Sequence, residues 1–140
     1  MLRVIAVGLA AGVALLITDA LLNANPLAQR LYAAYGPIAR SNVNALAGSL
    51  IDLAYGSILA VLFVALWSGL PGETRLVKGL SFGLMVWFLR VVMRVASDWV
   101  ATTVPLSTHA YTLVGGLVQI LLVAVLIAVL LPRPGLSGTT

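Results

Sequence analysis

The segment VWFLRVVMRVASDWVATTV, residues 86–104, is apolar enough for a membrane helix but contains three charged side chains. These side chains, Arg90, Arg94 and Asp98, follow one another at intervals of four residues. Residues four apart lie on the same side of an α-helix. A charge at the centre of a membrane helix costs at least about 2.5–3.5 kcal/mol. The sequence therefore predicts a membrane helix whose charged side faces other helices or a polar cavity.

The composition supports a membrane location for the whole chain. Of the 140 residues, 61% are hydrophobic and only 9% are charged, whereas soluble domains carry roughly 25% charged residues. The net charge of +4 comes from scattered cations, and without a basic patch no nucleic-acid partner is expected. The chain has no cysteine, which excludes disulfides and thiolate metal sites.

Four apolar segments have the length of about 20 residues that a helix needs to cross a bilayer. They cover residues 2–22, 46–70, 80–103 and 111–131. The sequence predicts an all-α integral membrane protein, a four-helix bundle in a single domain over residues 1–132. A short polar tail, residues 133–140, follows it.

A fifth, shorter helix is predicted between the first two segments. Asn25 and Pro26 are typical of an N-cap followed by proline at the first helical position. Leu27, Leu31 and Tyr35 then recur at near-helical spacing. This pattern predicts a short amphipathic helix that lies in the membrane interface and covers one end of the bundle over residues 26–39.

The distribution of lysine and arginine predicts the orientation in the membrane. The predicted topology divides these residues unequally: Arg3, Arg75, Lys78 and Arg133 on one side, and Arg30 and Arg40 on the other. By the positive-inside rule both termini are expected in the cytoplasm. A bacterial cytoplasmic (inner) membrane is the expected location, with the amphipathic helix on the exterior face.

Each predicted helix has one side of small and polar residues, and small and polar residues mark contacts between membrane helices. The ionisable residues within the spans lie toward the exterior. The predicted ligand-binding residues are Asp19, Asp52, Tyr55, Arg90, Arg94, Asp98, His109 and Gln119. Two interpretations stay open: an ion-pair network that fixes the helices, and a polar pocket that opens to the exterior.

Specific contacts are predicted within this group. Arg94 is expected to pair with Asp98 on its own helix or with Asp52, and Arg90 is expected to contact Gln119. His109 is the only histidine and is expected to form hydrogen bonds at the interface rather than to bind a metal. No metal site is predicted.

Three classes of function fit these features. The first is a non-enzymatic accessory subunit or assembly component of a membrane complex. The second is a small transporter or ligand-binding protein that uses the charged cluster as a proton, ion or anion site. The third is an intramembrane enzyme for an amphiphilic substrate, with Asp52 and Asp98 as the candidate acid and base.

The expected partners are the lipid bilayer and, within the membrane, another protein or a second copy of the chain. No cofactor is predicted, and a lipid or another hydrophobic molecule is the class of ligand considered.

Overall fold

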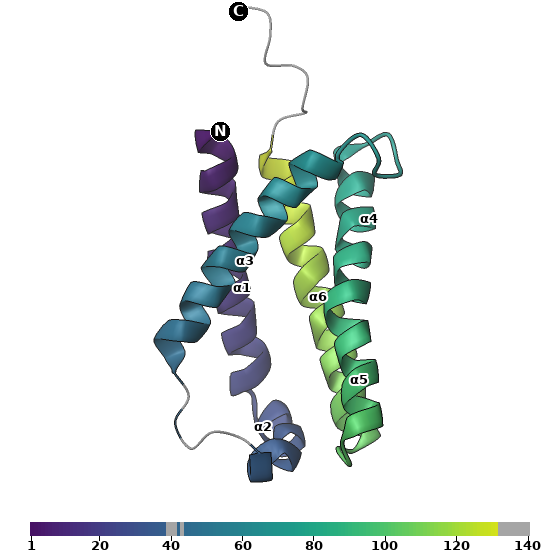
Figure 1. Cartoon of the computed structure of the whole chain (residues 1–140). Helices are drawn as coiled ribbons and strands as arrows, with labels where there is room; N and C mark the ends of the chain where they lie inside the picture. Colours follow the sequence, from purple (N-terminus) through teal and green to yellow (C-terminus); the bar gives the residue numbers. More distant parts are fainter. Residues whose placement is uncertain (39–41, 43, 132–140) are drawn as a thin grey trace, which may run out of the picture.

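A computed structural model describes residues 1–38, 42 and 44–131 of the chain. Over these residues the secondary structure is helical and contains no strand. Four helical spans are long and apolar enough to cross a membrane: Leu2–Ala24, Ala45–Leu66, Arg75–Ala101 and Leu106–Leu130 (Figure 1). The predicted all-α architecture with four membrane-spanning helices is confirmed.

The first, second and fourth spans are the continuous helices α1 (Leu2–Ala24), α3 (Ala45–Leu66) and α6 (Leu106–Leu130). The third span has three parts. They are the α-helix α4 (Arg75–Trp87), a turn of π-helix, η2 (Phe88–Val92), and the α-helix α5 (Met93–Ala101).

A short helix is also present where the sequence predicts an interfacial one. It begins as α2 (Pro26–Tyr32), where the Asn25 side chain accepts a hydrogen bond from the Ala28 backbone N–H. The chain then tightens into a 3-10 helix, η1 (Ala33–Ile38). Proline lacks an N–H and disfavours α-helical geometry in the residue before it, which explains why the α-helix does not continue to Pro37.

Three predicted helix boundaries are wrong. α4 begins at Arg75 rather than at residue 80, with Thr74 as its N-cap. α3 ends at Leu66 rather than at residue 70 because the chain turns over residues 67–70. α6 begins at Leu106 rather than at residue 111, directly after Pro105. Its polar first turn, which includes Thr108 and His109, has the composition of a loop. Arg40, Arg133 and the predicted polar tail lie outside the described residues.

Glycines set the packing of the helices in pairs. α1 packs on α3 where a Cβ atom on Gly12 would lie 2.6 Å from the Cα atom of Leu53. α4 packs on α6 where a Cβ atom on Gly79 would lie 2.7 Å from the Cβ atom of Ala128. Gly8 and Gly12, a GxxxG pair, therefore serve contacts inside the chain. α6 also contacts α1 and so joins the two pairs.

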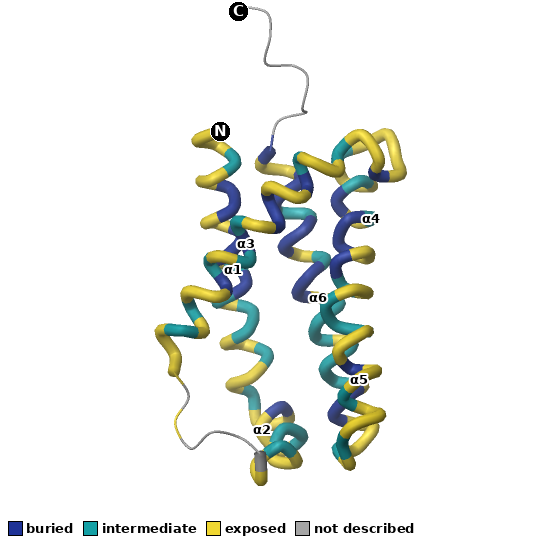
Figure 2. The backbone as a smooth tube through the Cα atoms, viewed as in Figure 1, coloured by how far each residue is buried: buried dark blue, intermediate teal, exposed yellow. Residues whose placement is uncertain are grey.

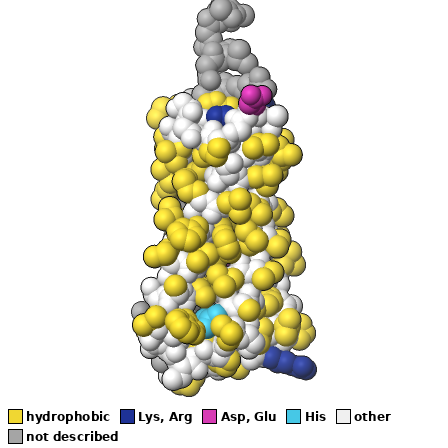
Figure 3. All heavy atoms as spheres, turned by 90° about the vertical axis from the view of Figure 1, so that its right-hand side faces the viewer, with side chains coloured by type: hydrophobic (Ala, Val, Ile, Leu, Met, Phe, Trp, Pro, Cys, Tyr) yellow, Lys and Arg dark blue, Asp and Glu magenta, His cyan; other side chains and the backbone are white. Residues whose placement is uncertain are grey.

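The apolar core is concentrated near the termini (Figure 2). There the rings of Phe63 and Phe82 meet edge to face, with centroids 5.3 Å apart. An Arg3 Nη2 atom donates to the Leu130 carbonyl oxygen over 3.2 Å, which places the start of α1 beside the end of α6. Hydrophobic side chains cover much of the outer surface (Figure 3), as expected for a surface in contact with lipid.

Candidate functional site

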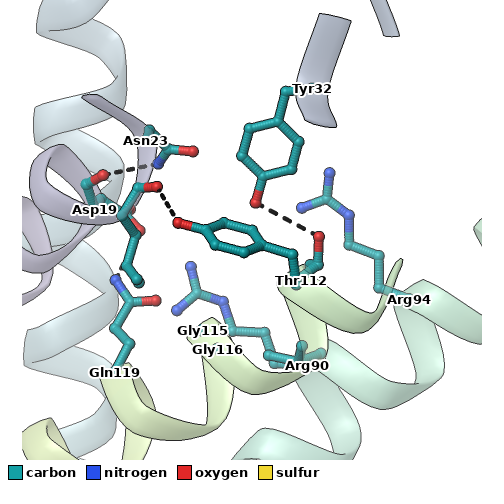
Figure 4. Close-up of a pocket in the computed structure, with 12 residues that line it drawn as sticks. Asp19, Asn23, Tyr32, Arg90, Arg94, Thr112, Gly115, Gly116 and Gln119 are labelled. Carbon is teal, nitrogen blue, oxygen red and sulfur yellow. Dashed lines mark hydrogen bonds between the residues drawn. The ribbon is translucent and has the colours of Figure 1, made fainter. Parts of the chain in front are cut away.

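A polar pocket of about 300 Å³ lies in the half of the bundle far from the termini (Figure 4). Four parts of the chain contribute to it: the end of α1, the interfacial helix α2, the η2–α5 region, and the first half of α6. The lining residues are Asp19, Leu22, Asn23, Tyr32, Arg90, Val91, Arg94, Tyr111, Thr112, Gly115, Gly116 and Gln119.

The π-helical turn η2 positions the central cation of this pocket, Arg90. In η2 the Met93 N–H donates to the Phe88 carbonyl, five residues earlier. Turns of this kind are rare and occur frequently at functional sites. The widened turn changes the angular spacing of the residues that follow it. Arg90 is partly buried beside the pocket, whereas the Arg94 side chain is 80% exposed. Both arginines nevertheless border the same pocket, as the charged side predicted for this span requires.

The Arg90 guanidinium lies over the ring of Tyr55, with 4.0 Å between its central carbon and the ring centroid. This distance is well within the range of a cation–π interaction. Its Nη1 atom is buried and has no hydrogen-bond partner in the part of the chain that the structure describes. A buried donor without a partner costs free energy, about 1–3 kcal/mol and more when the group is charged. Arg90 is therefore held in place but incompletely satisfied.

The opposite side of the pocket contains a carboxylate. Gln119 on α6 donates from Nε2 to the Asp19 Oδ1 atom over 2.6 Å and lies 3.1 Å from the Thr18 hydroxyl. Within the described residues, the one ion pair closer than 4.0 Å joins Arg94 and Asp98. Asp19 and Arg90 thus border the same pocket without direct contact.

Hydrogen bonds hold α2 against the pocket. The Tyr111 hydroxyl donates to the Leu22 carbonyl over 2.7 Å and accepts from the Asn25 side chain over 2.8 Å. The Tyr32 ring packs edge to face on Tyr111, with centroids 5.8 Å apart. The Thr108 hydroxyl donates to the Leu31 carbonyl over 3.0 Å. These contacts fix the interfacial helix to the start of α6.

Two adjacent glycines leave one surface of α6 free of side chains. A Cβ atom on Gly116 would lie 2.9 Å from a methyl carbon of Val91, and one on Gly115 would lie 3.4 Å from Leu22. Larger residues at these positions would reduce the pocket or push its walls apart. The Gly115–Gly116 pair is therefore part of what forms the cavity.

The structure brings four of the predicted site residues together at the pocket: Asp19, Arg90, Arg94 and Gln119. The other four do not line it. Tyr55 supports Arg90, and Asp98 lies 3.9 Å from Arg94 in the predicted ion pair, which is confirmed. Asp52 is buried on α3, within electrostatic range of Asp19 and Arg90.

The predicted contact between Arg90 and Gln119 is replaced by two others. Gln119 donates to α1 residues, and the contact found for Arg90 is with the Tyr55 ring. His109 is only 2% exposed, and neither of its ring nitrogens has a hydrogen-bond partner within residues 1–38, 42 and 44–131. The predicted hydrogen-bonding role of His109 at the interface is therefore wrong. α6 begins one turn earlier than predicted, so His109 lies inside the helix rather than before it.

Eight pocket residues were not among the predicted site residues: Leu22, Asn23, Tyr32, Val91, Tyr111, Thr112, Gly115 and Gly116. Four of them lie on α6 and share a face with Gln119, because positions 111, 115 and 119 repeat every four residues. This four-residue repeat is the sequence signal that could have identified the α6 residues of the pocket. Tyr32 had no comparable signal, because its position depends on how α2 folds back over the bundle.

The chemistry available in the pocket is that of charge recognition. A guanidinium and a carboxylate from different helices face a common space, with amide and hydroxyl groups nearby. In the described part of the chain, no three His, Cys, Asp or Glu side chains are grouped so as to hold a metal ion.

A family model matches residues 4–135 of the chain, and the chain therefore belongs to DUF6789, a family of unknown function. No curated protein and no solved structure matches the chain.

Proposed function

We propose that this member of the DUF6789 family is a small membrane protein that binds an anionic molecule in the polar pocket, with Arg90 as the main anion-binding group. The observation that carries the proposal is the buried Arg90 Nη1 atom, which has no hydrogen-bond partner among the described residues although Arg90 borders a cavity of about 300 Å³. An oxygen atom of a carboxylate or phosphate would supply the missing acceptor.

Three features around Arg90 support a binding role. Tyr55 covers one face of the guanidinium, which restricts its motion and leaves its edge for a ligand. The π-helical turn gives up regular α-helical hydrogen bonding at this residue. Arg94, which also lines the pocket, adds a second positive charge.

The same geometry favours binding over acid–base catalysis. A general acid and a general base must both reach the reacting atoms. The candidate pair does not share the pocket, since Asp52 is buried on α3 and Asp98 pairs with Arg94. The proposed orientation follows from the sequence: with both termini in the cytoplasm of a bacterial cell, the pocket would open toward the exterior of the inner membrane. A role as an accessory subunit of a membrane complex remains an alternative proposal.

The test uses the full chain purified in mild detergent, with inorganic phosphate and hexanoate as anionic probes. Each probe is expected to raise the melting temperature of the wild type. Arg90→Gln should weaken binding at least about tenfold, because a hydrogen bond to a charged group contributes about 1.5–3 kcal/mol. Arg90→Lys keeps the charge without the planar donor pair and should show intermediate binding.

Arg30→Gln is the matched control, because Arg30 is an exposed cation of α2 outside the pocket lining. It should bind both probes as the wild type does. Equal binding by the wild type and both Arg90 variants would contradict the proposal. Native mass spectrometry tests the alternative: a stable complex with another protein and no effect of either anion would favour the accessory-subunit role.

A further inference from the structure

We infer that the ligand of this pocket is a zwitterion, with an oxoanion bound at Arg90 and a primary ammonium group bound at Asp19 and Asn23. The inference rests on the proposed function, because it takes the anion site at Arg90 as one end of the ligand. It adds the chemistry of the other end.

The first argument is the separation of charge across the pocket. Asp19 comes from α1 and Arg90 from η2, and both line the cavity although no ion pair joins them. Two opposite charges left apart at membrane depth are costly, because each is stabilised mainly by pairing. A ligand that carries both charges would neutralise both side chains at once.

The second argument is the shortage of cations at the Asp19 side. Asp52 adds a second carboxylate, and it lies within electrostatic range of both Asp19 and Arg90, so two carboxylates share the charge of one guanidinium. The two cations that line the pocket, Arg90 and Arg94, both come from the η2–α5 region, and Arg94 is shared with Asp98. An anionic ligand alone would leave the Asp19 side uncompensated, whereas an ammonium group would supply the missing positive charge there.

The third argument concerns the acceptors that remain free at this side. Gln119 occupies the Asp19 Oδ1 atom, and no hydrogen bond to Oδ2 is present among the described residues. Asn23 uses its amide nitrogen to donate to the Asp19 backbone carbonyl. In the described part of the chain, its side-chain oxygen has no donor. Asp19 and Asn23 both line the pocket and lie next to each other in Figure 4. Two free acceptors suit a primary ammonium, which donates hydrogen bonds.

The size and position of the pocket fit a polar headgroup. A volume of about 300 Å³ is at the lower end of the range for ligand pockets. α2, which is amphipathic and interfacial by prediction, contributes Tyr32 to the pocket lining. The shared chemistry is an amine and a phosphate a few atoms apart. It is present in phosphatidylethanolamine of the bilayer and in free glycerophosphoethanolamine.

The experiment is a competition in mixed micelles that contain the full chain and equal amounts of three lipids with identical acyl chains. The lipids carry ethanolamine, choline or glycerol headgroups, and native mass spectrometry reports which one remains bound. We expect the wild type to retain phosphatidylethanolamine about tenfold over phosphatidylcholine, because a quaternary ammonium cannot donate to Asp19. Asp19→Asn should lose this preference and shift toward phosphatidylglycerol, whose headgroup is anionic.

Asp98→Asn is the matched control, since it removes one carboxylate near Arg94 but outside the pocket lining. It should keep the preference of the wild type. Asn23→Ala tests the second acceptor if Asp19→Asn does not fold, and it should reduce the ethanolamine preference several-fold. In a second arm, glycerophosphoethanolamine is added to the wild type. Protection from unfolding by this soluble compound without lipid enrichment would identify a free zwitterion as the source.

The outcomes separate this inference from the proposed function. If the wild type prefers phosphatidylglycerol, or if Asp19→Asn leaves the ranking of lipids unchanged, the zwitterion is excluded and the anion site stands. If no lipid and no soluble probe binds in an Arg90-dependent manner, both proposals fail.

Discussion

The two ends of the bundle satisfy their polar groups in opposite ways. Near the termini, Lys78 donates from Nζ to the Trp67 carbonyl over 2.6 Å and to the Leu70 carbonyl over 2.9 Å. The ammonium thereby satisfies carbonyl groups where α3 ends. At the pocket end lie all the buried side-chain polar atoms that have no partner in the described part of the chain. They are Nη1 of Arg90 and both ring nitrogens of His109.

This difference indicates which end of the bundle has a functional role in addition to a structural one. Buried polar groups in folded proteins nearly always have partners, and an exception calls for an explanation. The end near the termini follows this rule and also contains most of the apolar core. The pocket end contains buried polar atoms without partners, and it also contains the π-helical turn and the Gly115–Gly116 pair. Violations of local rules are expected to concentrate at functional sites.

The largest expected effect concerns the close packing of α1 on α3. A Cβ atom on Gly56 would overlap the backbone of Gly12, which cannot rotate away. Gly56→Ala should destabilise the protein by about 3 kcal/mol or more, the upper part of the range for overpacked sites. Thermal unfolding in detergent measures the effect.

Gly48→Ala is the control on the same helix, because a Cβ atom there would meet no atom within 4 Å. It should unfold at the wild-type temperature or slightly above. Equal melting temperatures for the two variants would show that the glycine contact does not hold α1 and α3 together.

The end near the termini gives the second prediction. Lys78→Met removes the donor to two backbone carbonyls and the cation 5.0 Å from the Trp67 ring centroid. The expected loss of stability is about 1.5–3 kcal/mol, the value for a hydrogen bond to a charged group. Arg75→Met, a matched change one turn away, should cost clearly less, since the Arg75 side chain makes no hydrogen bond in the described part of the chain. Similar losses would contradict the role of Lys78 at the end of α3.

Sequence patterns predicted most of the helical architecture and less of the pocket. The membrane spans follow from hydrophobic length, and the interfacial helix follows from Asn25 and Pro26, because both signals are local. The π-helical turn has no local signature, so the sequence did not predict that Arg90 is partly buried whereas Arg94 is largely exposed. Tyr32 and Asn23 reach the pocket only through the tertiary arrangement of α1 and α2.

A smaller effect is expected for Arg94, within the pocket end itself. Its side chain is 80% exposed and lies 3.9 Å from Asp98. Exposed ion pairs contribute about 0.2–1 kcal/mol, and a long side chain can extend its charge toward the interface. Arg94→Gln should therefore lower stability by less than about 1 kcal/mol. A loss comparable to that of Lys78→Met would mean that Arg94 has a buried structural role, as the charged stripe in the sequence suggested.

The smallest effect concerns Tyr35 of η1, which lies outside the spans. Burial raises the pKa of the Tyr35 hydroxyl above its ordinary value of 10.0, the negative charge of Asp98 raises it further, and Arg94 lowers it. The folded protein thus holds this proton more tightly than the unfolded chain. Because the unfolded chain loses the proton first, stability should fall as the pH rises above about 10.

Tyr35→Phe isolates this contribution from the other groups that titrate in the same range. The difference in melting temperature between the wild type and Tyr35→Phe should be constant at pH 8–9. Above about pH 10 the melting temperature of the wild type should fall relative to that of Tyr35→Phe. Asp98→Asn should reduce the shift, since it removes the negative charge that opposes ionisation of Tyr35. Parallel curves for the wild type and Tyr35→Phe up to pH 11 would mean that η1 leaves Tyr35 in water. In that case the cover that α2 and η1 form over the pocket end would stop at Tyr32, whose ring packs on Tyr111.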